Sequence, residues 1–127
     1  MSVGYSGTPL PRKLGIKEGS RVAVVAAPEG FVLDAALVPL GANMDVILFF
    51  VLERHELERC FDELAALLTP AGGLWIAWPK RSAGVPTDLS DNVVRAVGLA
   101  HGLVDNKVCA VTEVWSGQRF VRRLRDR

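Results

Sequence analysis

The chain has 127 residues, of which 50% are hydrophobic and 23% are charged, and its formal net charge is +1. This composition predicts one folded domain spanning residues 1–127, long enough to bury a core without disulfides. A near-neutral charge argues against a protein that coats DNA or lies on a membrane surface. No apolar stretch approaches the roughly 20 residues that span a bilayer, and the N-terminus lacks the apolar segment of a signal peptide. We therefore expect a cytoplasmic protein with no membrane association.

Residues 1–20 are expected to form an N-terminal arm. Within it, residues 10–14 can make one helical turn that ends at Gly15 in a left-handed conformation. Residues 21–27 are predicted to be the first strand. Residues 31–40 have apolar side chains at helical spacing, which predicts a short helix closed by Pro39 and Gly41.

The centre of the chain predicts a parallel βαβ unit. Residues 45–52 and 74–79 are apolar runs that suit strands buried on both faces, and residues 53–68 form an amphipathic helix between them. Residues 69–73 are predicted to be a turn. The apolar stripe of the helix consists of Leu57, Cys60, Phe61, Leu64, Leu67 and Leu68, so Cys60 is interpreted as a core residue.

The last third of the chain predicts one helix and a hairpin. Residues 80–87 should be a polar loop, followed by a helix that Thr87 or Asp88 caps and that ends near His101. Residues 106–114 and 118–124 should then pair as antiparallel strands across a turn at residues 115–117. The order predicts an α/β protein of two or three layers. Its sheet should be Rossmann-like, mostly parallel and of about five strands, with a C-terminal antiparallel hairpin.

Two segments resemble a known family. Residues 14–25, Leu-Gly-Ile-Lys-Glu-Gly-Ser-Arg-Val-Ala-Val-Val, resemble the first strand of class I S-adenosylmethionine-dependent methyltransferases and its approach. Residues 45–76 resemble the fourth strand, the next helix and the fifth strand, including the Leu-Thr-Pro-Ala-Gly-Gly turn. The whole chain, notably residues 4–10, 78–89 and 107–111, also resembles an uncharacterised bacterial family of small proteins, a resemblance that implies no activity.

The departures from the methyltransferase pattern lie where that family binds its cofactor. The resemblance implies a glycine-rich turn after the first strand, but Ala26, Ala27 and Pro28 occupy most of its positions and only Gly30 remains. Val24 stands where the family has an acid. There is also no room for the second strand, which ends in the acid that binds the cofactor's ribose. An active methyltransferase is therefore not expected, and no cofactor is predicted.

The predicted strand order has a consequence for the sheet. If the three parallel strands lie side by side in chain order, right-handed crossovers place all three predicted helices on the same face. Residues 47, 49 and 51 should face one way and residues 46, 48 and 50 the other. Because the second face is also apolar, we expect the N-terminal arm and a second copy of the chain to cover it, which predicts a homodimer. A different order, with the second strand on the other side of the first, would relax this need.

Ligands of open α/β sheets bind beyond the carboxyl ends of the strands. Those ends carry cations, hydroxyl groups and a helix N-terminus, which suit a small anion such as phosphate or carboxylate. The candidate residues are Glu29, Gly30, Lys80, Arg81, Ser82 and Thr87. No catalytic Ser/His/Asp or Cys/His arrangement and no metal site can be assembled from the spacing.

The C-terminal arginines form the densest positive patch of the sequence. They are Arg119, Arg122, Arg123, Arg125 and Arg127. They could contact nucleic acid, but a solvated strand edge explains them more simply, so a nucleic-acid partner is not expected. The sequence supports three hypotheses. The first is a non-catalytic methyltransferase-like binding or assembly protein. The second is a protein that uses the crevice at the carboxyl ends of the strands, either to bind an anionic or nucleotide-type ligand or as an enzyme, and the third is a nucleic-acid accessory protein.

Overall fold

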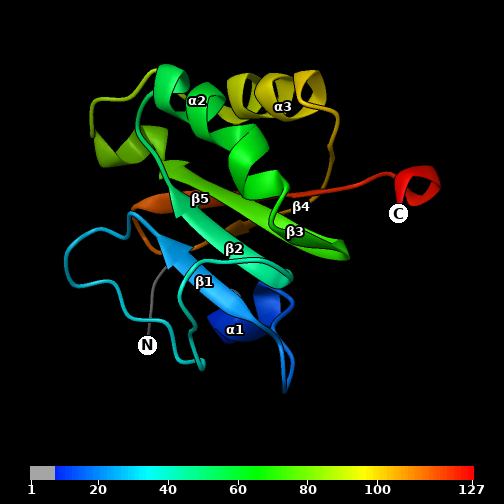
Figure 1. Cartoon of the computed structure of the whole chain (residues 1–127). Coiled ribbons are helices and arrows are strands. Elements are labelled where there is room, and N and C mark those ends of the chain that lie inside the picture. Colours follow the sequence, from blue (N-terminus) through cyan, green and yellow to red (C-terminus); the bar gives the residue numbers. More distant parts are fainter. Residues whose placement is uncertain (1–7) are drawn as a thin grey trace.

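The computed structural model describes residues 8–127, and its centre is one five-stranded sheet (Figure 1). In spatial order the strands are β1 (Val22–Val25), β2 (Met44–Phe50), β3 (Leu68–Pro79), β5 (Trp115–Val121) and β4 (Val104–Ala110). The first three strands run parallel, and β5 and β4 complete the sheet as an antiparallel pair. The predicted α/β class and the C-terminal hairpin are confirmed, and the sheet is mixed, with two parallel and two antiparallel pairings.

Two helices cover one face of the sheet. They are α2 (Arg54–Ala65), which links β2 to β3, and α3 (Asp91–Ala100), which links β3 to β4. Figure 1 shows both on the same side of the sheet, with the short α1 (Leu10–Lys13) on the other side. Parallel strands in chain order with right-handed crossovers require this arrangement of α2 and α3.

The side chains of β2 alternate between two cores, as their spacing predicts. Ile47 and Phe49, together with Val51 just after the strand, pack with α2 and α3. Val46, Leu48 and Phe50 pack into a second core on the opposite face. Both faces of the central strand are therefore buried, which explains its continuous apolar run.

The second face is covered by the chain itself. The side chain of Leu14, just after α1, is fully buried in the second core, and its carbonyl accepts a hydrogen bond of 3.1 Å from Nε1 of Trp75. Gly15 has a φ of +80°, the predicted left-handed end of the helical turn. Residues 1–7 of the predicted arm lie outside the described residues.

The predicted helix at residues 31–40 is wrong. This segment has no helical turn, and the N–H of Val38 instead donates to the carbonyl of Val22, beside an isolated bridge between Val22 and Leu37. Leu33 is buried in the second core and the ring of Phe31 packs on Phe50, with centroids 4.8 Å apart. Apolar contacts on the second face and pairing with β1 therefore replace local helical hydrogen bonds. The segment joins α1 as the cover of that face.

The second parallel strand pair also differs from the prediction. The helix ends at Ala65, and β3 begins at Leu68 rather than at residue 74. Met44 pairs with Leu68 and Val46 pairs with Gly73, so the predicted turn at residues 69–73 is a wide irregularity inside β3. This irregularity lies at the edge of the sheet where the parallel strands begin.

The ends of two later elements are also shifted. Ser90 caps α3, its Oγ accepting a hydrogen bond from the N–H of Val93, so neither Thr87 nor Asp88 is the cap. The hairpin turn lies at residues 111–114, where Oγ1 of Thr112 accepts hydrogen bonds from the N–H groups of Val114 and Trp115. Trp115 is consequently the first residue of β5. Within the described residues, no helix is long and apolar enough to cross a membrane.

Candidate functional site

The parallel strands β1, β2 and β3 end along one border of the sheet, which we call the carboxyl edge. A hollow of about 480 Å³ opens there, between the residues that follow β1 and β2. Its walls are mostly apolar and include Phe50, Leu52, Pro86 and Trp115. The rings of Phe50 and Trp115 meet edge to face with centroids 5.1 Å apart, which fixes one side of the hollow.

The turn after β1 forms another side of this hollow, through Ala26 and Pro28. Ala26 has a φ of +58°, a left-handed conformation that costs a residue with a Cβ about 1–2 kcal/mol. Pro28 has no N–H to offer a ligand. The backbone therefore bends as a glycine turn would, but it presents a methyl group and a proline ring to the hollow.

The charged groups in the lining of this hollow are the carboxylates of Glu53 and Glu56. Glu56 accepts hydrogen bonds of 2.7 Å from Nη2 of Arg59, and this contact lowers the pKa of the Glu56 carboxyl group. Because none of the described residues that line this hollow is a cation, its chemistry favours an apolar or cationic group over an anion.

Two of the predicted site residues follow β1. Glu29 and Gly30 lie in an exposed turn, where Gly30 has a φ of +84°. Neither residue lines the hollow between β1 and β2. Glycine at position 30 permits the backbone conformation of the turn, since residues with a Cβ rarely adopt that φ.

The other predicted site residues follow β3. Arg81 and Ser82 are exposed in the 3-10 helix η1 (Arg81–Ala83), next to Lys80. Arg81 and Thr87 line a separate hollow of about 340 Å³, which the carboxylates of Asp88 and Asp91 also line.

The hydroxyl group of Thr87 is already engaged. It donates a hydrogen bond to the carbonyl of Leu52 and accepts one from the N–H of Leu89. The neighbouring Asp88 accepts a hydrogen bond of 2.7 Å from the N–H of Arg54, at the start of α2. These contacts tie the loop after β3 to the end of β2, so Thr87 has a structural role beside the hollow.

Sequence reasoning missed Trp115 as a wall of the carboxyl-edge hollow. The sequence predicts it in the hairpin turn, whereas it pairs with Pro79 as the first residue of β5. Its only signal in the sequence was an aromatic side chain beside a predicted turn, and the register of the hairpin decides where that side chain lies.

The surroundings of Cys60, Cys109 and His101 indicate structural roles for these side chains. Burial raises the pKa of both the Cys60 and the Cys109 thiol, which disfavours the reactive thiolate. His101 caps the end of α3, and its Nδ1 lies 2.7 Å from Oδ1 of Asp62 on α2. In the described part of the chain, no group of three His, Cys, Asp or Glu side chains is placed to hold a metal ion.

Comparison with known proteins gives structural likeness without sequence likeness. No family model and no curated protein sequence matches the chain. Magnesium protoporphyrin IX methyltransferase from Synechocystis PCC 6803 with bound S-adenosylmethionine matches with a TM-score of 0.51 at 13% identity, over 66% of this chain. A structure described as a pericyclic reaction enzyme matches with a TM-score of 0.53 at 10% identity, over 91% of this chain.

The match spans less than half of each of those two structures, 41% and 47% of their lengths. The strand order β1-β2-β3-β5-β4 and the position of α2 and α3 on one face agree with the methyltransferase-like arrangement that the sequence predicts. Within the described residues, the 18 positions from 26 to 43 between β1 and β2 contain no strand beyond the isolated bridge at Leu37. The chain thus has the fold of class I S-adenosylmethionine-dependent methyltransferases, without the strands that the family places between its first and fourth.

Proposed function

We propose that this chain is a non-catalytic, methyltransferase-like domain that acts by binding rather than by methyl transfer. The observation that carries the proposal is the turn after β1, where Ala26 and Pro28 line the hollow at the carboxyl edge. A methyl group and a proline ring obstruct the close backbone approach that a glycine-rich turn allows. The missing second strand also removes the position of the acid that the resemblance implies for ribose binding.

Calorimetric titration of the full chain with S-adenosylmethionine tests this proposal. The expected result is no binding heat up to about 1 mM ligand, which corresponds to a binding free energy weaker than about −4 kcal/mol. S-adenosylhomocysteine, titrated into a matched sample, should give the same result. Micromolar binding of either compound would overturn the non-catalytic assignment.

An anionic or nucleotide-type ligand at the carboxyl edge is the alternative. It is supported by Arg81 and Thr87, which line one hollow. Against it stand the two carboxylates in the same hollow and the engaged hydroxyl group of Thr87. Replacing both Lys80 and Arg81 by Gln should abolish phosphate-dependent NMR shifts at residues 80–91 if this alternative holds, and shifts there that survive the double substitution would remove it.

A homodimer is the assembly that we propose. Apolar side chains remain exposed in the segment beside β1, with 83% of Val32, 48% of Leu37 and 43% of Leu40 accessible to solvent. Beyond the bridge at Val22, β1 is also an open edge of the sheet, which can accept a second strand. Light scattering on an eluting size-exclusion peak should give twice the chain mass of 13.8 kDa, and a single-chain mass would contradict the dimer.

A nucleic-acid role receives less support. Of the tail arginines, Arg119 and Arg122 are partly buried, and Arg122 donates to carbonyl groups of the chain, so three of the five, Arg123, Arg125 and Arg127, are exposed. We therefore retain the binding-domain proposal without a nucleic-acid partner, and a cytoplasmic location remains a prediction.

A further inference from the structure

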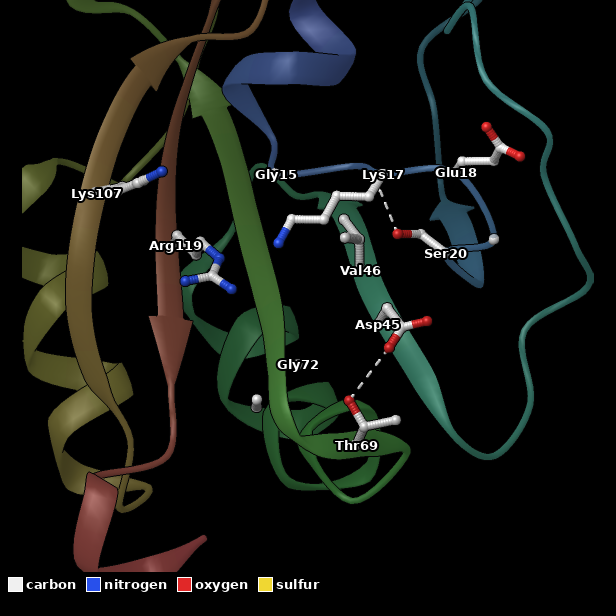
Figure 2. A pocket seen from close by; sticks show the side chains of 12 residues that line it. Gly15, Lys17, Glu18, Ser20, Asp45, Val46, Thr69, Gly72, Lys107 and Arg119 are labelled. Atoms are coloured by element: carbon white, nitrogen blue, oxygen red, sulfur yellow. Dashed lines mark hydrogen bonds between the residues drawn. The ribbon is translucent and has the colours of Figure 1, made fainter.

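A second hollow lies at the opposite border of the sheet, where β1, β2 and β3 begin. We call this border the amino edge. The hollow measures about 460 Å³ and is bounded by the turn before β1, the starts of β2 and β3, and the antiparallel strands (Figure 2). Three cationic side chains line it: Lys17, Lys107 and Arg119. They come from positions far apart in the sequence, so the fold itself gathers them.

Arg119 forms the floor of this amino-edge hollow. Its guanidinium group lies against the backbone of Gly73, where an added Cβ would collide with Nε of Arg119. Nε is buried and has no hydrogen-bond partner among the described residues. Burial lowers the pKa of Arg119, and the positive charge of Arg127 lowers it further. A buried donor without a partner is costly, so hydrogen bonds within the described residues do not explain the position of this guanidinium group.

Lys107 lies directly across from Arg119 in the pairing of β4 with β5. Side chains at opposed positions of antiparallel strands point to the same face, so two positive charges stand side by side. Figure 2 shows Lys17 reaching toward Arg119 from the turn before β1. Among the described residues, none of these three cations forms an ion pair.

Two acids, Asp45 and Glu18, also line the hollow. Both carboxylate oxygens of Asp45 are engaged, one by the N–H of Arg21 at 2.8 Å and the other by Oγ1 of Thr69 at 3.5 Å. In Figure 2 the side chain of Glu18 points away from the three cations. With three cations against these two acids, the lining of the hollow carries a net positive charge.

We propose that the amino-edge hollow is a binding site for a phosphate-bearing small molecule, held by Arg119, Lys107 and Lys17. The guanidinium group offers parallel N–H donors that match two phosphate oxygens, and the two ammonium groups supply point charges around them. The volume lies within the roughly 300–1,000 Å³ range of small-molecule sites. Gly72 also lines the hollow, and a Cβ there would lie 2.7 Å from the carbonyl oxygen of Met44, so the close approach of β2 and β3 requires glycine at this position.

The convergence of the cations favours a small ligand over a nucleic acid. A nucleic-acid surface spreads its cations along the backbone path of the ligand, whereas these three surround one hollow. The site also lies at the opposite end of the strands from the carboxyl edge. The inference therefore goes beyond the proposed function and does not depend on whether the chain binds a methyl donor.

Calorimetric titration of the full chain with pyrophosphate, and then with inorganic phosphate, tests this site. We expect pyrophosphate to bind, with a loss of about 10-fold or more in Arg119→Gln and about 3- to 10-fold in Lys107→Gln and in Lys17→Gln, since each substitution removes a charge-assisted contact. The control is Arg125→Gln, which removes an exposed tail charge and should change the affinity less than about twofold. Raising the salt concentration should weaken binding to the natural chain.

Lys17 and Lys107 are exposed, so their variants keep the test decisive if Arg119→Gln does not fold. Absence of pyrophosphate and phosphate binding overturns the proposal. The proposal is also overturned if Lys17→Gln and Lys107→Gln leave the affinity for pyrophosphate unchanged. It is overturned as well if Arg125→Gln lowers that affinity as much as they do. A single-stranded oligonucleotide that displaces pyrophosphate and depends on Arg123 and Arg125 would move the site to the tail and also overturn it.

Discussion

Lys107 and Arg119 are direct cross-strand partners on β4 and β5 although both are positively charged. Like charges at opposed positions destabilise a sheet, typically by a few tenths of a kcal/mol up to about 1 kcal/mol. A sequence selected for stability alone would place an acid at one of the two positions. At this pair, stability favours an acid at one position, whereas the proposed anion binding favours two cations.

The first prediction concerns this pair. Lys107→Glu should raise the free energy of unfolding by about 0.5 kcal/mol, because it replaces a repulsive cross-strand pair by an attractive one. The same variant should lose pyrophosphate binding. Urea unfolding measures the stability, and Lys17→Glu is the control, because it lies in the turn before β1 outside any named strand. A destabilised Lys107→Glu protein would show that the two charges do not interact as described.

The second prediction concerns Arg122, which anchors the start of β3 to the end of α2. Its guanidinium group donates to the carbonyls of Ala65, Leu68 and Thr69 at 2.8, 3.3 and 2.9 Å. Arg122→Met should lower the free energy of unfolding by about 2–3 kcal/mol, because it leaves carbonyl groups without a donor. Chemical denaturation measures this loss.

Arg123→Met is the matched control, since Arg123 is exposed and one position away. It should stay within about 0.5 kcal/mol of the natural protein. Equal losses in the two variants would mean that the tail acts through its total charge rather than through the three carbonyls.

The third prediction concerns Asp88, whose carboxylate accepts a hydrogen bond from the N–H of Arg54 in the first turn of α2. Asp88→Ala should cost about 1 kcal/mol, through the lost hydrogen bond and the lost complement to the helix dipole. Asp34→Ala is the comparison, since Asp34 is an exposed acid of the segment after β1. If thermal unfolding shows the two variants to be equally stable, Asp88 does not act as an N-terminal partner of α2.

The fourth prediction is a pH dependence that originates at Asp105. Burial alone would raise the pKa of its carboxyl group, but hydrogen bonds from Arg95, its own backbone and Gln118, with the charge of Arg95, lower it overall. A depressed pKa means that this stabilisation is complete above the unfolded-state value and is lost as the pH falls.

Asp105→Asn should therefore be about 1–2 kcal/mol less stable at pH 7, because it loses charged contacts to α3 and to the buried Gln118. The difference should shrink as the pH falls through and below the ordinary Asp value of 3.8. Unfolding curves for both proteins at pH 7, 5 and 3 measure it. A difference that stays constant with pH would exclude Asp105 as its origin.

The alternation of β2 was readable from the sequence because its signal is local. Residues 47, 49 and 51 and residues 46, 48 and 50 separate by strand geometry alone, and the apolar stripe of α2 follows helical spacing. The helix predicted at residues 31–40 failed because its apolar side chains are used by partners distant in sequence. Phe31 packs on Phe50, and Val38 bonds to Val22.

The candidate sites were less predictable for the same reason. Strand order places Lys17, Lys107 and Arg119 around one hollow, and the β4–β5 register decides that Lys107 faces Arg119. A slip of one residue would move Lys107 to the other face of the sheet. Since the sequence suggested a turn at residues 115–117 and the structure has it at 111–114, the pairing could not be predicted.

A residue-resolved NMR titration of the full chain tests the two proposals most directly. They are that the methyltransferase-like fold does not bind the methyl donor at its carboxyl edge, and that the amino-edge hollow binds a phosphate-bearing ligand. With pyrophosphate, the account predicts shifts at the amide groups around residues 15–20, 69–73, 107 and 119. With S-adenosylmethionine, it predicts none at residues 26–30 and 50–53. Shifts at residues 26–30 and 50–53 with S-adenosylmethionine, and none around Arg119 with pyrophosphate, would contradict it.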